Sequence, residues 1–141
     1  KDIIAIPFDE LRSIGLSNAK TNYVLNVCNF FIENKITDAR MHKMQDEELI
    51  EFLTQIKGVG RWTAEMILMF TLGREDVFAV DDLGIQQAIC KLYKIDAGDK
   101  KAMKQKMLKI SAKWSPYRTY ACRYLWGWKD GEGIPKVKGE R

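Results

Sequence analysis

A glycine-rich turn is the segment of this sequence whose residue types most directly indicate a binding chemistry. Gly58 and Gly60 flank Val59, which we expect to anchor the turn in the core, and helical apolar patterns lie on both sides. Glycines permit positive backbone dihedrals, and without a Cβ they let a DNA phosphate approach the main chain closely. A helix that begins after such a turn adds unpaired amides and the positive end of its dipole. Lys57 and Arg61 add charge attraction that is independent of base sequence.

The Gly-Val-Gly pattern of residues 58–60 alone leaves two interpretations open, a phosphate-binding turn and a plain tight turn between antiparallel helices. The longer segment 53–64, Leu-Thr-Gln-Ile-Lys-Gly-Val-Gly-Arg-Trp-Thr-Ala, resembles the hairpin signature of the helix-hairpin-helix-GPD superfamily of base-excision DNA glycosylases. The resemblance runs from about Leu11 to Trp128. It implies that DNA phosphates are bound at Gly58, Gly60, Arg61 and Thr63.

Two adjacent acids follow the hairpin, and from the residue types alone either could simply cap a helix. Asp82 lies twenty residues after Trp62, and segment 78–84 is similar to the 3-methyladenine DNA glycosylase II group, in which the second acid is catalytic. The resemblance therefore implies Asp82 as the catalytic carboxylate and Asp81 as an orienting or capping residue. An ionised carboxylate near deoxyribose C1′ stabilises oxocarbenium character and can orient or deprotonate the attacking water.

Aromatic residues supply the expected base pocket. In bifunctional members of the superfamily a hairpin lysine forms a Schiff base, and the matching position here is Trp62, which implies hydrolysis without strand cleavage. An aromatic face attracts a cationic methylated purine that has been flipped out of the duplex. The resemblance implies a pocket formed by Trp62, Met66 and Trp126, while Trp114 and Trp128 are expected to pack in the core.

Few residues could hold a cofactor. Cys28, Cys90 and Cys122 are far apart, which argues against a disulfide framework, a zinc site and an iron–sulfur cluster. We expect that no cofactor is required, and that the single histidine, His42, lies in a solvated loop. The resemblance implies one monovalent cation on main-chain carbonyls of Thr54, Ile56 and Val59.

Helices must position these residues, because apolar residues recur at spacings of three and four almost throughout, and only Val77–Val80 reads as extended. The pattern predicts an all-α fold. The hairpin is expected to span residues 47–72, with its second helix running from Arg61 to Leu72 and ending at Gly73. We expect helix caps at Ser17, Asp46, Asp81 or Asp82, Asp99 and Ser115, the last followed by Pro116 at the first helical position. The first long helix is expected to bury Val24, Val27, Cys28 and Phe31.

Composition sets the remaining expectations. The chain has 141 residues, 46% of them hydrophobic, which suits one globular domain, and its net charge of +4 permits phosphate binding without demanding it. It has no apolar run long enough for a membrane span and no recognisable signal peptide, so we expect a cytoplasmic protein, nucleoid-associated in a bacterium or nuclear in a eukaryote. Residues 1–128 are expected to form the C-terminal part of the glycosylase domain, and 129–141 a flexible basic tail. Helices that precede Leu11 in the superfamily, including the one with the wedge residue, are not recognisable.

The predicted function is therefore that of a monofunctional, monomeric glycosylase acting on double-stranded DNA that contains alkylated purines such as 3-methyladenine or 7-methylguanine. Three other interpretations remain open at this point. A non-catalytic helix-hairpin-helix module would explain the hairpin but not Asp82. A bifunctional glycosylase for oxidised bases would need an amine where Trp62 stands. An all-α protein-interaction domain would show no salt-dependent affinity for DNA.

Overall fold

The computed structural model describes residues 2–131 of the chain. Over this range the structure is helical and contains no β-strand, which confirms the all-α prediction, and Val77–Val80 pairs with no other segment as a strand. The chain divides into two compact units, residues 1–64 and 65–141. No helix in the described part has the length and apolar character needed to cross a membrane.

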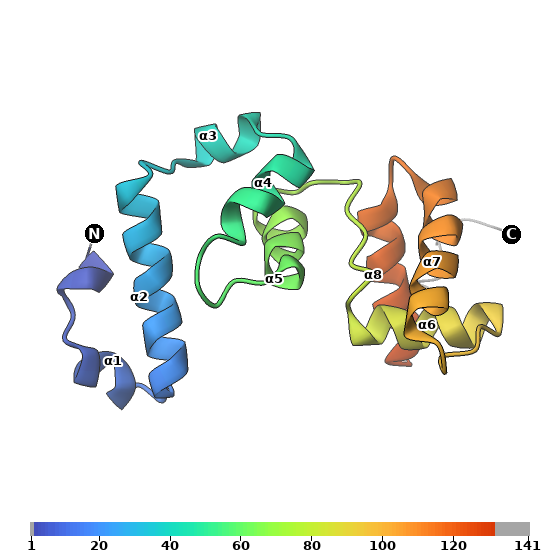
Figure 1. The fold of residues 1–141 in the computed structure, drawn as a ribbon, viewed down its shortest axis with the longest axis horizontal. Coiled ribbons are helices and arrows are strands. Elements are labelled where there is room, and N and C mark those ends of the chain that lie inside the picture. Colours follow the sequence, from blue (N-terminus) through green and yellow to red (C-terminus); the bar gives the residue numbers. More distant parts are fainter. Residues whose placement is uncertain (1, 132–141) are drawn as a thin grey trace, which may run out of the picture. The chain divides into compact units, whose positions relative to one another are not determined.

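The first unit contains short helices around one long one (Figure 1). Ser17 caps the long helix as predicted, because its side chain accepts a hydrogen bond from the Lys20 amide at 3.3 Å. The elements are a 3₁₀ turn at Asp2–Ala5, then α1 (Phe8–Ser13), α2 (Asn18–Glu33), α3 (Asp38–Lys43), α4 (Asp46–Leu53) and the first four residues of α5 (Arg61–Met66), whose last two residues belong to the second unit.

Two predictions for this unit are wrong in detail. His42 lies on helix α3 and not in a loop, although its side chain is exposed as expected. The residue that caps α4 is Gln45, not Asp46. Gln45 and Glu48 form a reciprocal capping box, in which the main-chain N–H of Gln45 donates to the Glu48 carboxylate at 3.3 Å.

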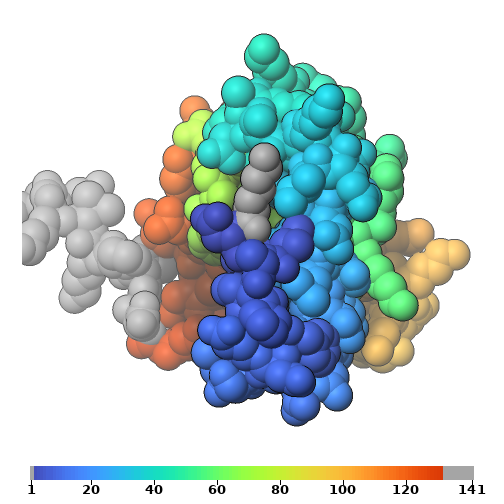
Figure 2. Space-filling model, turned by 90° about the vertical axis from the view of Figure 1, so that its left-hand side faces the viewer, coloured from blue at the N-terminus to red at the C-terminus, as the bar shows by residue number. Residues whose placement is uncertain are grey.

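The predicted apolar stripe of α2 is only half-buried. Thr21 is the one residue of this helix that is fully buried. The 3₁₀ turn and α1 lie against α2, as Figure 2 shows in dark and lighter blue. These two elements are only four and six residues long, much shorter than the sixteen residues of α2.

The second unit packs three helices around a small apolar core (Figure 1). Helices α6 and α8 lie side by side, and α7 contacts α6. Ile85, Ile89, Met107 and Cys122 have no exposed surface. The elements are a π-helical turn at Ile67–Thr71, α6 (Leu83–Tyr93), α7 (Lys100–Ser111), a 3₁₀ turn at Ala112–Trp114 and α8 (Arg118–Lys129). The predicted tail beyond α8 lies almost entirely outside the described residues.

The ends of these elements match the sequence-based expectations in part. Gly73 ends the hairpin's second helix as predicted, with φ +66° and a hydrogen bond of 2.9 Å from the Arg74 amide to the Leu68 carbonyl. That helix does not stay α-helical to its end, since the Leu72 amide donates to the carbonyl of Ile67, five residues earlier.

Of the two helix caps predicted for α7 and α8, one is confirmed and one is wrong. Asp99 caps α7 as predicted, because its carboxylate accepts from the Lys101 and Ala102 amides. Ser115 does not cap α8, which begins only at Arg118. Its hydroxyl donates instead to the Asp76 carboxylate at 2.7 Å, a contact 39 residues away in the sequence that the local pattern does not reveal.

Candidate functional site

The turn between α4 and α5 uses its two glycines differently. Gly58 has φ +101°, and a Cβ placed there would lie 2.2 Å from Cδ1 of Tyr23, so both the dihedral and the space demand glycine. Gly60 does not have a positive φ, so the expectation of positive dihedrals is wrong at this position. A Cβ at Gly60 would meet no atom within 4 Å. What glycine provides there is open space over an exposed main chain.

Helix α2 supports this turn from beneath. The Tyr23 ring fills the space under Gly58, and Nδ2 of Asn26 donates to the Lys57 carbonyl at 3.1 Å. Ile56, 3% exposed, anchors the turn in the core, whereas Val59, expected in that role, is half-buried. Sequence reasoning did not single out Tyr23 and Asn26. Their spacing of three residues on one helix was the available signal.

The predicted phosphate and base contacts at the start of α5 are accessible. Arg61 makes a two-point ion pair with Glu47, in which Nη2 lies 2.6 Å from Oε1 and Nη1 lies 3.0 Å from Oε2. Both of these side chains are exposed. Trp62 is 47% exposed, and Thr63 is half-buried. Arg61 therefore reaches the surface with a carboxylate already oriented against it, which sequence reasoning did not anticipate.

In the second unit, Asp82 is held by two N–H donors on one oxygen. It is the N-cap of α6, and its Oδ1 accepts from the Ile85 amide at 2.9 Å and from Nε1 of Trp126 at 2.8 Å. The two donors come from different helices. They hold the carboxylate in one orientation at the first turn of α6.

Asp81 does not cap α6, so the capping part of the orienting or capping role expected for it is wrong. Its carboxylate forms an ion pair with Lys104 of α7, and the side chain is 39% exposed. The cap falls to Asp82 because that residue directly precedes the helix and reaches the amide three residues later.

Gly84 makes the contact between Asp82 and Trp126 feasible. A Cβ at this position would lie 3.1 Å from Oδ1 of Asp82 and 3.1 Å from Cδ1 of Trp126. Both distances are shorter than ordinary van der Waals contacts, so a larger residue would push the indole or the carboxylate away. A glycine in the first turn of a helix, where its propensity is poor, was the available sequence signal.

An exposed aromatic surface lies next to this carboxylate. The ring of Phe70 is 5.9 Å from that of Trp126 between centroids, at an interplanar angle of 32°, within the range of favourable aromatic pairs. Phe70 is 61% exposed, and Met66 is half-buried. Phe70 was missed from the sequence, although Trp62, Met66 and Phe70 recur at intervals of four. An exposed ring beside a fixed carboxylate can stack on a planar ligand.

The segment that leads to Asp82 is tied to the first turn of α8. Arg118 donates to both oxygens of Asp76, at 2.6 and 3.0 Å, and these hydrogen bonds hold the pKa of that carboxyl below its ordinary value of 3.8. The Thr119 hydroxyl donates to the Arg74 carbonyl at 2.7 Å and accepts from the Val77 amide at 3.0 Å. Because Trp126 lies on the same helix, these bonds keep the two halves of the site together.

Cys122, Trp114 and Trp128, also singled out from the sequence, pack against other parts of the protein. Cys122 is buried beside this segment, and desolvation raises the pKa of its thiol to about 11, so it is protonated at neutral pH. The edge of the Trp114 ring contacts Phe78, and Lys91 lies over the ring of half-buried Trp128. In the part of the chain that the structure describes, no group of three His, Cys, Asp or Glu side chains could hold a metal ion.

Comparison with known proteins places these features in a family. Residues 1–113 match the family described as HhH-GPD superfamily base excision DNA repair protein. DNA-3-methyladenine glycosylase 1 of Schizosaccharomyces pombe is 39% identical over 127 residues, which are 89% of this chain and 54% of that protein.

Solved structures agree with this match. A 3-methyladenine DNA glycosylase of S. pombe in complex with abasic DNA superposes with a TM-score of 0.77 at 37% identity, over 89% of this chain and 60% of that one. A DNA-3-methyladenine glycosidase from Bacillus halodurans gives a TM-score of 0.78 at 36% identity, over 90% and 57% of the two chains.

The chain spans about half the length of the curated relatives it matches. Its family match nevertheless covers most of its own residues, including both the hairpin and Asp82. The chain belongs to the HhH-GPD superfamily of base excision DNA repair proteins.

Proposed function

We propose that this protein is a DNA glycosylase that hydrolyses the N-glycosidic bond of alkylated purines, with Asp82 as its catalytic carboxylate. One observation carries the proposal. The Asp82 carboxylate is held by two N–H donors on one oxygen, beside the aromatic pair of Phe70 and Trp126. The names of similar proteins as 3-methyladenine DNA glycosylases support the choice of substrate class.

The proposed reaction requires charge stabilisation more than acid catalysis. As the bond from C1′ to the purine nitrogen breaks, its electron pair leaves with the base and the sugar becomes cationic. The carboxylate of Asp82 stabilises that cation, and water attacks C1′ while giving up a proton to the carboxylate or to solvent. An alkylated purine is already cationic, so its departure neutralises the base without a proton from the protein.

The aromatic residues fit the recognition of a cationic base. We propose that Trp126 has two functions: its indole N–H orients Asp82, and its ring, with that of Phe70, offers a surface on which a flipped base stacks. Trp62 carries no amine that could form a Schiff base, which supports hydrolysis without strand cleavage. We expect that borohydride traps no covalent adduct between the protein and damaged DNA.

The hairpin fits the complementary function of holding the DNA backbone. We propose that the main chain at Gly58, Gly60 and Thr63 and the Arg61 guanidinium bind phosphate. The carbonyls of Thr54 and Ile56 lie in the turn that follows α4, and carbonyl oxygens are ligands for hard cations. With the carbonyl of Val59 they suit a hard monovalent cation, although the Ile56 carbonyl already accepts from the Val59 amide at 2.9 Å. Such a cation would add positive charge near the phosphate.

Replacing Asp82 by asparagine tests the proposal. Asp82→Asn keeps an oxygen that can accept from Ile85 and Trp126, so the cap survives and only the charge is lost. We expect the full-length variant to release 3-methyladenine and 7-methylguanine from methylated DNA about 100-fold more slowly or worse. Its affinity for DNA should not fall. Chromatography of the freed bases measures the rate.

Asp81→Asn is the matched control, because it removes the same charge one residue away from a side chain that pairs with Lys104. We expect its rate of base release to stay within about threefold of the wild type, as for a surface ion pair. Equal rates for the Asp82 variant and the wild type would contradict the proposal. Binding of DNA without any base release by the wild type would favour a non-catalytic DNA-binding module.

A further inference from the structure

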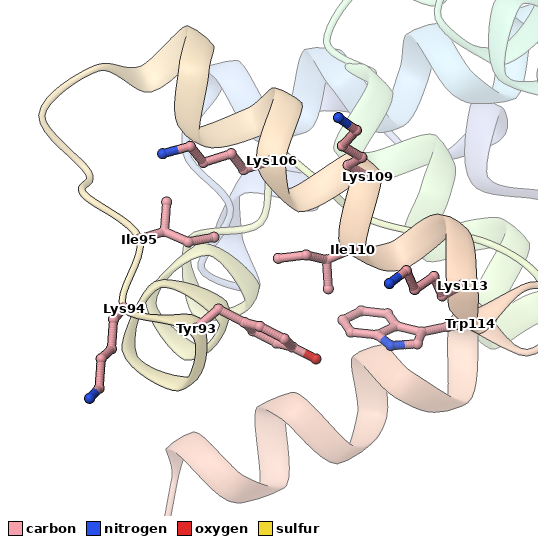
Figure 3. A pocket seen from close by; sticks show the side chains of 8 residues that line it. All are labelled: Tyr93, Lys94, Ile95, Lys106, Lys109, Ile110, Lys113 and Trp114. Carbon is pink, nitrogen blue, oxygen red and sulfur yellow. The ribbon is translucent and has the colours of Figure 1, made fainter.

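A hollow at the C-terminal end of α6 is separate from the Asp82 site. It encloses about 610 Å³ between the end of α6, one face of α7 and the 3₁₀ turn that follows (Figure 3), a volume typical of small-ligand pockets. Asp82 caps the opposite end of α6, which has eleven residues and a length of about 16 Å. A ligand in this hollow would therefore not touch the catalytic carboxylate.

The rim of the hollow is strongly basic. Lys94, Lys106, Lys109 and Lys113 line it, and no acidic side chain does. The three lysines of α7 and its 3₁₀ extension recur at spacings of three and four, which places them on one face. Between residues 2 and 131, none of these four ammonium groups forms an ion pair. An anion can therefore approach them without displacing a carboxylate from an ion pair.

The nearest acids in the sequence, Asp96 and Asp99, form no ion pair with these lysines in the described part of the chain. Oδ1 of Asp96 accepts from the Gly98 amide at 2.9 Å, and Oδ1 of Asp99 accepts from the amides at the start of α7. Both carboxylates serve as local caps between α6 and α7. The residues that line the hollow carry positive charge and no negative charge, which is complementary to an anionic ligand.

The floor of the hollow is aromatic and apolar. Figure 3 shows the Tyr93 ring, the Ile110 side chain and the Trp114 indole gathered at its centre. Tyr93 is 49% exposed, and Trp114 is held by edge contact with Phe78 at 5.9 Å between centroids. Such rings offer a stacking surface to a planar group, which a simple phosphate-binding patch would not need.

The lining side chains select a ligand rich in hydrogen-bond acceptors. Among the lining side chains, the ammonium groups and the indole N–H only donate, and the Tyr93 hydroxyl is the one group that can also accept. Phosphate oxygens and base carbonyls match this set. A peptide would bring amide N–H groups for which the lining side chains offer few acceptors. We propose that this hollow binds an unpaired nucleotide of a DNA strand, with phosphates at the lysines and the base against Tyr93 and Trp114.

This site does not depend on the glycosylase activity proposed above, and its test measures binding alone. The full-length protein is titrated with fluorescein-labelled octathymidylate, and anisotropy is followed between 50 and 200 mM salt. We expect Lys109→Gln with Lys113→Gln to weaken binding about tenfold or more at 50 mM salt, and to reduce the salt slope by about 1.4, or 0.7 per lost phosphate contact.

Lys100→Gln with Lys101→Gln is the matched control, because it removes the same charge from α7 outside the hollow. It should change the affinity by less than about threefold. Comparing the two double variants also separates the hollow from the hairpin, which both variants retain. Equal losses in the two variants would overturn the proposal, since general charge would then explain the binding.

Two further measurements test the aromatic floor. Tyr93→Leu should weaken octathymidylate binding about fivefold or more, whereas Tyr93→Phe should not. An abasic octamer has the same phosphates but no bases to stack on Tyr93. Its affinity for the wild type should therefore be about as low as the affinity of octathymidylate for Tyr93→Leu. Equal affinity for the abasic and thymidine octamers would overturn base stacking.

Other outcomes identify a different occupant or separate the two proposals. If octathymidylate does not bind, while a glutamate-rich peptide with a tryptophan binds and depends on Lys109 and Lys113, the hollow docks a protein and the proposal is wrong. Asp82→Asn should keep octathymidylate binding while it loses base release, so failure at one site is distinguishable from failure at the other.

Discussion

The hairpin turn of the first unit is formed by main-chain groups, whereas the Asp82 site of the second unit is formed by side chains. The hairpin turn is main chain, closed by a hydrogen bond between Val59 and Ile56, three residues apart, and shaped by the positive φ of Gly58. The Asp82 site is made of side chains, and its central hydrogen bond joins residues 44 apart in the sequence. The hairpin turn is sensitive to an added Cβ at Gly58, whereas the Asp82 site is sensitive both to an added Cβ at Gly84 and to the loss of the single N–H donor of Trp126.

The largest effect that would test this comparison is expected at Trp126. Trp126→Phe removes the N–H that donates to Asp82 but keeps an aromatic ring near Phe70. A hydrogen bond to a charged group is worth about 1.5–3 kcal/mol. We therefore expect kcat for base release to fall about 10- to 100-fold with little change in KM. Steady-state kinetics on methylated DNA provide both values.

Trp128→Phe is the control, because Trp128 lies on the same helix and contacts Lys91 instead of Asp82. Its kcat should remain close to that of the wild type. A normal kcat in the Trp126 variant would show that the indole contributes only its ring, and the distinction between the two sites would weaken.

The next effect concerns the two glycines of the hairpin. Gly58→Ala places a Cβ 2.2 Å from the Tyr23 ring on a backbone with φ +101°, and we expect it to lower the free energy of unfolding by about 2 kcal/mol. Gly60→Ala meets open space, so stability should change by less than about 0.5 kcal/mol. Denaturant unfolding of both variants makes the comparison.

Gly60→Ala, which should hardly change stability, is expected to change the affinity for DNA. The Cβ of Gly60→Ala should hinder close approach of a phosphate to the main chain, and we expect duplex DNA to bind about tenfold more weakly to this stable variant. Anisotropy with undamaged duplex DNA measures the change. Unaltered affinity would refute a main-chain phosphate site at Gly60.

The smallest effect is expected from the ion pair between Asp76 and Arg118. Its hydrogen bonds lower the pKa of Asp76 in the folded state, so the pair stabilises the fold above the ordinary value of 3.8. That contribution is lost as the pH falls below 3.8 through the lowered pKa. We expect Asp76→Asn to cost about 1 kcal/mol at pH 7, since the pair is partly exposed.

The pH dependence provides the control for this variant. The unfolding temperatures of the wild type and Asp76→Asn should differ by a constant amount above about pH 5, and the difference should shrink as the pH falls below 3.8 through the lowered pKa. A difference that does not change with pH would show that the Asp76 side chain acts through packing instead of charge. This would leave the tie between the Asp82 segment and α8 without its electrostatic component.

Prediction from sequence succeeded where one short segment contains all the interacting groups. The caps at Ser17 and Asp99 and the helix end at Gly73 each involve hydrogen bonds spanning a few residues. It failed where a distant partner competes, as when Ser115 donates to Asp76 instead of capping α8. It failed also for the α2 stripe, because periodicity indicates which side of a helix is apolar but not how well that side is covered.

By itself, the sequence determined that the protein is helical, where the hairpin turn lies and that one of two adjacent acids starts α6, because these follow from short-range backbone hydrogen bonds and glycine sterics. Only the tertiary structure decided that Trp126 donates to that acid, that Gly84 leaves room for the contact and that Phe70 adjoins the indole. It also decided that four lysines surround an aromatic hollow at the far end of the same helix. Each of these arrangements depends on how α6, α7 and α8 pack, and residues far apart in the sequence become neighbours only through that packing.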